Sequence, residues 1–334
     1  MSNVEARPEE LLCPPGSGQP DPGAGVVEVL EPREVPLGGP RAMTVRRTLP
    51  QRQRSLIGAW CFADHYGPDD VSETGGMDVP PHPHTGLQTV SWLFSGEIEH
   101  RDSLGTHAFI RPGELNLMTG GRGIAHSEVS TPATTIVHGA QLWVALPEQH
   151  RHSPKAFQHF RPEPVTVDGT CVSVFLGSLL GSTSPVETFT PLLGAEIVMD
   201  AGARMELSLD PAYEHGVLAD TEGLTVDGAM VGRGAMAYRP TGRTTLTLAN
   251  EAAAPGRAIL LGGPPFEEEI VMWWNFVGRT HEDIVEARDD WMAHSERFGE
   301  VQGYAGRITH LPAPAIPPVR IRPRRSSAPT RAAD

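Results

Sequence analysis

The feature of this 334-residue chain that most restricts its fold is a repeated pattern of short strand-forming runs separated by turn residues. Runs rich in β-branched and aromatic residues occupy 87–96, 107–121 and 135–146, and a second set lies between 170 and 250. The chain contains 36 glycines and 32 prolines, which favour many turns over long helices. Closely spaced turn glycines are typical of small barrels and sandwiches, so the pattern predicts an all-β protein with two antiparallel barrels.

The order of these runs predicts a domain organisation with five parts. We expect a disordered tail (1–24), a first barrel (25–150), a Pro-rich polar connector (151–164), a second barrel (165–310) and a second disordered tail rich in Pro and Arg (311–334).

One helix is expected within the second barrel segment, over 281–298. Thr280 can cap it with Asp283 at the third helical position, and Gly299 can end it. Ile284, Trp291 and Phe298 recur at intervals of seven, so the helix should pack one face on a barrel.

Charge and composition exclude some classes of function. The formal net charge of −14 argues against direct nucleic-acid binding. Cys13, Cys61 and Cys171 form neither a disulfide framework nor a zinc pattern, which favours a cytoplasmic protein. No apolar run has the length of a membrane span or a signal peptide, so we expect no contact with a membrane.

The segment PPHPHTGLQTV places two histidines, His82 and His84, one residue apart at the start of a predicted strand. Residues i and i+2 of a strand point to the same face, so the two imidazoles should lie side by side. Buried without partners they would be destabilising, and charged they would repel each other. A shared transition metal removes both problems, because neutral imidazole is a good metal ligand.

A second pair, His126 and Glu128 in TGGRGIAHSE, has the same spacing. Three histidines and one carboxylate from two strands would leave coordination positions open, as dioxygen chemistry requires. An HxH pair alone is weak evidence; His150 and His152 have this spacing too, and a solvated loop explains them better. Between residues 165 and 280 the second barrel contains one histidine, His215, and no HxH pair, so we expect it to be free of metal.

These motifs carry a resemblance to a known family. PPHPHTGLQTVSWLFSGEIEHRDSLG, IRPGELNLMTGGRGIAHSE and the late GGPPFEEEIVMWWNFVGRTHEDI resemble the pirin family of the cupin superfamily, over roughly residues 25–310. The resemblance implies a bicupin, in which two cupin-type antiparallel β-barrels carry a packed C-terminal helix and the first barrel binds metal. It also implies that His82, His84, His126 and Glu128 are the metal ligands. The family metal is usually Fe(II), with Ni, Cu, Mn or Zn as other candidates.

The same resemblance implies two alternative functions. Several pirins cleave the flavonol quercetin with dioxygen and release carbon monoxide, and here Glu128 would be the catalytic base. Eukaryotic members act instead as nuclear co-regulators of transcription, so a non-catalytic redox sensor that binds a protein partner is the alternative. Gln88 stands where many pirins have glutamate, which could alter hydrogen bonding around the site. Nothing in the sequence demands an oligomer, and we expect a monomer.

Further residues have two interpretations each. His100 and Asp102 in GEIEHRDSLG could orient the metal ligands, or could form a surface turn. The aromatic residues of the first barrel, namely Trp92, Phe94, Phe109 and Trp143, could line a substrate pocket, although core packing is the commoner role.

Overall fold

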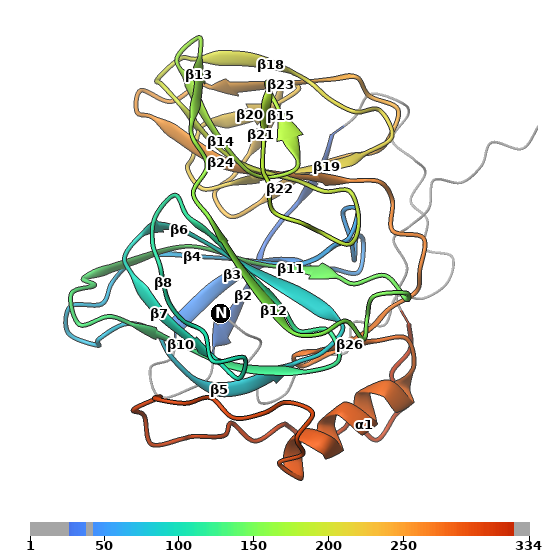
Figure 1. Ribbon diagram of the computed structural model, residues 1–334. Coiled ribbons are helices and arrows are strands. Elements are labelled where there is room, and N and C mark those ends of the chain that lie inside the picture. The colour runs from blue at the N-terminus through green and yellow to red at the C-terminus, as the bar shows by residue number, and fades with distance from the viewer. Residues whose placement is uncertain (1–26, 38–42, 324–334) are drawn as a thin grey trace, which may run out of the picture.

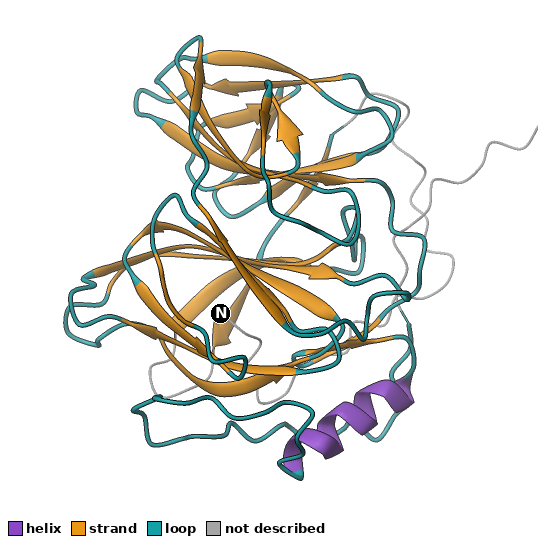
Figure 2. Ribbon diagram, viewed as in Figure 1, coloured by secondary structure: helices purple, strands orange, loops and turns teal. Residues whose placement is uncertain are grey.

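A computed structural model describes residues 27–37 and 43–323 of the chain. Its strands form two barrels that stack on each other, with one helix beside the first barrel (Figures 1 and 2). The helix, α1 (His281–Met292), is the only one in the described part of the chain. The predicted fold class, an all-β protein with two cupin-type barrels and a C-terminal helix, is confirmed.

The first barrel consists of two facing antiparallel sheets. One sheet has the order β5-β10-β7-β8, with β5 (Asp78–His84), β10 (Ile124–Ser130), β7 (Ile98–Asp102) and β8 (His107–Ile110). The other has the order β12-β9-β6-β11-β4-β3-β2, with β12 (Ala156–Phe160), β9 (Leu115–Thr119), β6 (Leu87–Ser95), β11 (Ile136–Ala145), β4 (Trp60–Asp70), β3 (Met43–Leu49) and β2 (Arg33–Leu37).

The second barrel repeats this arrangement. Its larger sheet has the order β1-β22-β19-β24-β17-β14-β13, with β1 (Glu28–Leu30), β22 (Met236–Arg239), β19 (Glu214–Ala219), β24 (Gly256–Gly263), β17 (Leu193–Met199), β14 (Thr170–Leu176) and β13 (Val165–Val167). Its smaller sheet has the order β18-β23-β20-β21, with β18 (Arg204–Ser208), β23 (Thr245–Asn250), β20 (Leu224–Val226) and β21 (Ala229–Val231). Two hairpins complete the fold: β15 (Ser178–Leu179) with β16 (Ser182–Thr183), and β25 (Val271–Trp273) with β26 (Phe276–Gly278).

Two strands lie outside the segments in which the sequence places their barrels. β12 falls in the expected connector, yet it pairs with β9 from Ala156↔Thr119 to Phe160↔Leu115 and so extends the first barrel. β1 precedes the first barrel in the chain but pairs with β22 of the second barrel. Each strand is recruited by a free sheet edge, which a local sequence pattern does not reveal.

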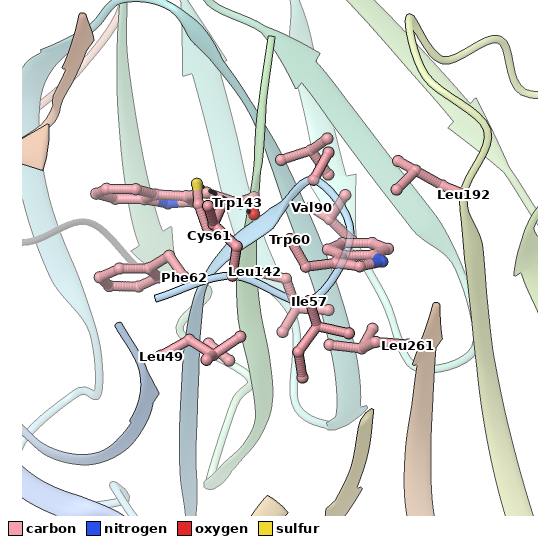
Figure 3. Packing of buried hydrophobic residues seen from close by; sticks show 14 of the residues in the cluster. Leu49, Ile57, Trp60, Cys61, Phe62, Val90, Leu142, Trp143, Leu192 and Leu261 are labelled. Carbon is pink, nitrogen blue, oxygen red and sulfur yellow. Dashed lines mark hydrogen bonds between the residues drawn. The ribbon is translucent and has the colours of Figure 1, made fainter. Parts of the chain in front are cut away.

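A hydrophobic cluster joins the two barrels (Figure 3). Trp60 and Leu142 of the first barrel pack in one cluster with Leu192 and Leu261 of the second. The Trp60 indole N–H donates to the Gly262 carbonyl at 3.2 Å, which fixes the larger sheets against each other. A separate cluster fills the second barrel with aliphatic side chains from Val172 to Leu260.

The helix has the predicted start but ends earlier than expected. Thr280 and Asp283 form a capping box, whereas the helix stops at Met292 rather than at residue 298. The backbone reverses at His294, whose φ of 55° is left-handed. Phe298 nevertheless packs with Trp291, so its spacing reflects burial after a turn and not helical continuation.

The C-terminal segment also differs from its expected disorder. Residues 1–24 and 324–334 lie outside the described part, so the predicted disorder of these tails is not tested there. Residues 311–323 return across the helix: the Trp291 indole N–H donates to Leu311 O at 2.8 Å, and Ala313 and Ile321 are buried against it. Apolar side chains between the prolines anchor this segment.

Candidate metal centre

Strand register brings the predicted site residues to one face of the smaller sheet of the first barrel. Between β10 and β5, His126 lies directly opposite His82, and Ile124 lies opposite His84. Opposite residues of antiparallel strands share a face, as do residues i and i+2. The three histidines therefore project together into the barrel, and all are buried.

The three imidazoles converge through their Nε2 atoms. His84 Nε2 lies 3.1 Å from His126 Nε2, and the rings of His82 and His126 have centroids 4.3 Å apart. Two nitrogens that each lie 2.0–2.1 Å from one metal at a right angle are about 2.9 Å apart. The observed separation fits this arrangement, and the group His82, His84 and His126 could hold a metal ion.

Burial keeps these imidazoles neutral, as a metal ligand must be. It lowers the pKa of His82 to about 4. Burial and the neighbouring His82 hold the pKa of His84 well below its usual range. Burial, His82 and His84 do the same for the pKa of His126.

Each ring has a polar neighbour on the side away from the cluster. His82 Nδ1 lies 2.8 Å from the Pro80 carbonyl, and the backbone of Asn275 lies near the ring of His84. His126 Nδ1 lies 3.4 Å from His100 Nδ1. A proton on Nδ1 of a metal-binding histidine leaves the Nε2 lone pair free for the metal, which is the usual arrangement in metalloproteins.

Glu128 lies one inward position further along β10, after a bulge between His126 and Glu128. Its carboxylate groups with His126 and His100, not directly with His82 and His84. Glu128 Oε1 also lies 3.4 Å from Ser91 Oγ on the opposite sheet. His126 thus belongs to both groups, and His100 is an additional inward-facing residue of the site.

Glycines allow the close approaches that frame the site. Gly86 has φ 69°, and a Cβ there would lie 2.0 Å from the Val277 carbonyl. This contact brings β26 beside the end of β5, where Val277 N–H donates to Thr85 O. Gly121, in the turn before β10, has φ 49° and equally close contact with Ser153 O.

The remaining residues singled out in the sequence have structural roles. Gln88 donates to Thr119 Oγ1 at 3.0 Å. Trp92 stacks on Phe175 of the second barrel, whereas Trp143 stacks on Phe62 and places its edge against His84. The tryptophans are thus core residues, of which only Trp143 borders the histidine cluster.

A second buried cluster joins the two barrels, and no motif in the sequence predicts it. His65 Nε2 and His138 Nε2 lie 2.7 and 2.5 Å from Asp220 Oδ1. His65 is on β4 and His138 is on β11, whereas Asp220 follows β19 of the second barrel. Their ligating atoms also lie close enough to hold a metal. These residues are far apart in the chain, and their separations match no metal-binding motif.

Comparison with known proteins places this architecture in a family. The model of the pirin family matches residues 42–144, and the model of the pirin C-terminal cupin domain matches residues 194–299. A "Pirin-like protein" of Caulobacter vibrioides is 33% identical over 75% of this chain and 88% of its own. The chain belongs to the pirin family.

Relatives of this pirin include proteins named for an enzyme activity. A Pseudomonas aeruginosa protein with the name "Putative quercetin 2,3-dioxygenase" is 42% identical over 95% of this chain and 98% of its own. The crystal structure of quercetin 2,3-dioxygenase from Acinetobacter baumannii superposes with a TM-score of 0.83 at 39% identity. That comparison covers 89% of this pirin and 97% of the other chain. Within residues 27–37 and 43–323, no helix has the length and hydropathy that a transmembrane segment requires.

Proposed function

We propose that this pirin is a metal-dependent dioxygenase that cleaves flavonols such as quercetin and releases carbon monoxide. The observation that carries the proposal is the convergence of three buried, neutral imidazoles beside the carboxylate of Glu128. The relatives named as quercetin dioxygenases, at 42% and 39% identity, support the choice of substrate class.

We assign His82, His84, His126 and Glu128 as the residues that hold the metal. Fe(II) is our choice of ion, because histidines with one carboxylate and open positions suit iron oxygenases, although Ni, Cu, Mn and Zn accept the same donors. When bound, the metal supplies a Lewis acid for the flavonol oxygens and redox chemistry for dioxygen.

The protein's own residues supply positioning and proton transfer. The Nε2 atoms of the histidines present lone pairs to one point, and the buried ring of Trp143 excludes water beside His84. Glu128 is our candidate to accept the proton of the flavonol 3-hydroxyl on a carboxylate oxygen. Ser91, 3.4 Å from Glu128 Oε1, can orient that carboxylate.

The test is to measure the metal content of protein purified without added metal, and then dioxygen uptake and carbon monoxide release with quercetin. Turnover that disappears on chelation and returns with metal supports the proposal. Metal binding without turnover contradicts it and favours the regulatory alternative with a protein partner. The Glu128→Gln variant keeps the three histidines and should bind metal more weakly; assayed at saturating metal, it should lose most turnover, whereas Glu114→Gln in the same barrel should retain both metal and turnover. Full turnover by Glu128→Gln would exclude its role as the base.

A further inference from the structure

We propose that Asp102 and His100 are positioning residues that fix the tautomer of His126 and thereby direct its Nε2 lone pair to the metal. The inference rests on the metal centre of the proposed function but not on the identity of the substrate. It gives a role to two buried side chains that are not among the four assigned ligands.

The arrangement begins with Asp102, which is 2% exposed at the end of β7 and directly opposite His126 on β10. Its Oδ1 accepts the backbone N–H groups of Leu104 and Thr106, both at 2.9 Å. Its Oδ2 lies 3.2 Å from His100 Nε2. Two backbone N–H groups thus donate to this carboxylate, and it acts as an acceptor toward His100 as well.

His100 transmits this constraint to His126. Because Asp102 only accepts, the ring proton of His100 lies on Nε2, and Nδ1 has the lone pair. That lone pair faces His126 Nδ1 at 3.4 Å. Two lone pairs repel, so His126 must be protonated on Nδ1. Its Nε2 lone pair then points toward His84 Nε2, where the metal would lie.

His126 differs in this respect from the other two histidines. The neighbours of the His82 and His84 rings at this position are backbone groups, those of Pro80 and Asn275, which side-chain substitutions leave in place. Among the three histidines, only His126 has a tautomer that depends on side chains. Mutation can therefore test whether Asp102 and His100 determine that tautomer.

The decisive variant is Asp102→Asn. The amide oxygen can still accept from Leu104 and Thr106, but the amide N–H₂ now donates to His100 Nε2. The proton of His100 moves to Nδ1 and forces the proton of His126 onto Nε2, which blocks the metal. We expect the Kd for Zn(II), measured by competition with a chelator, to rise about 10- to 100-fold. Asp220→Asn, which alters the other histidine cluster, is the matched control and should leave this Kd unchanged.

A double-mutant cycle separates positioning from general structural damage. In the His100→Leu background, Asp102→Asn should change the Zn(II) affinity little, because Asp102 acts through His100. An equal loss in both backgrounds contradicts the proposal. X-ray absorption of Zn(II)-loaded His100→Leu should show the same number of imidazole ligands as the wild type. Loss of one imidazole would identify His100 as a ligand and overturn the proposal.

The wild-type protein offers a test that needs no variant to fold. Long-range ¹H–¹⁵N NMR spectra of the metal-free protein should show His126 protonated on Nδ1 and His100 on Nε2. The opposite tautomers would overturn the inference. All these readouts are independent of quercetin, so an inactive protein that binds metal would contradict the proposed function and leave this inference standing.

Discussion

Two buried histidine clusters differ in the direction of their ring protons. One consists of His82, His84 and His126 in the first barrel, and the other of His65, His138 and Asp220 between the barrels. Both clusters are buried and both bring three ligating atoms within 4.8 Å of one another. In the first barrel the protons face outward to acceptors at Nδ1, and the lone pairs converge. At the interface the Nε2 atoms converge on a carboxylate, which requires them to donate.

Arginines reinforce this difference at the interface. Arg46 Nη1 lies 3.4 Å from His65 Nδ1 and can only donate, so His65 carries its proton on Nε2, toward Asp220. Arg257 Nη1 lies 3.3 Å from the other oxygen of Asp220. A cation would have to displace two protons beside two guanidinium groups. The interface cluster is therefore a set of hydrogen bonds that ties the barrels together, and proximity of ligating atoms alone does not make a metal site.

Removing one histidine from each cluster tests the comparison with the largest expected effect. His126→Ala should weaken metal binding by more than about 100-fold, since a ligand contributes more than its supporting hydrogen bonds. His138→Ala should leave metal binding unchanged. Metal content by elemental analysis, with folding checked by circular dichroism, provides the measurement. Metal loss in His138→Ala would show that the interface cluster also binds the ion.

The next effect concerns stability. Asp220→Asn removes the charge that accepts from His65, His138 and Arg257, and should lower the free energy of unfolding by about 3 kcal/mol. Denaturant unfolding of the metal-free protein measures this loss. As a control, Asp289→Asn removes an exposed pair with Arg288 and should change the free energy by less than about 1 kcal/mol. Equal effects of the two variants would mean that the interface cluster does not stabilise the fold.

A pH series gives the smallest effect. Burial lowers the pKa of His65 below its usual value of 6.5. As the pH falls from 7 to 5, His65 therefore binds a proton more readily in the unfolded chain than in the folded one. This difference lowers the free energy of unfolding. The stability advantage of the wild type over His65→Gln should shrink over this range, as followed by thermal unfolding. A constant difference between the wild type and His65→Gln over this range would contradict the neutral assignment.

Acidification also distinguishes Asp220. Burial raises its pKa, but hydrogen bonds from His138 and His65 outweigh burial and hold the pKa of Asp220 well below its usual value. The contribution of Asp220 to stability is thus fully present above pH 3.8, the usual pKa of an aspartate, and is lost only as the pH falls further. The Asp220 carboxylate should therefore stay ionised and keep its hydrogen bonds between pH 7 and 5, the range over which protonation of His65 begins to destabilise the cluster.

The sequence by itself determined the features that depend on neighbouring residues. Alternation along a strand puts His82 beside His84 and His126 near Glu128 on one face, whatever the rest of the fold. The capping residues Thr280 and Asp283 likewise act within one turn. Glycine spacing was sufficient to indicate two barrels.

Only the tertiary structure decided which of these segments meet. The register that sets His126 opposite both His82 and Asp102 brings His100 into the site, where the sequence left a surface turn equally open. The contact of Asp220 with His65 and the recruitment of β1 and β12 depend on sheet edges and faces distant in the chain. These long-range partners also determine the direction of each hydrogen bond, and so which nitrogen of each imidazole carries the proton. Local sequence cannot predict this.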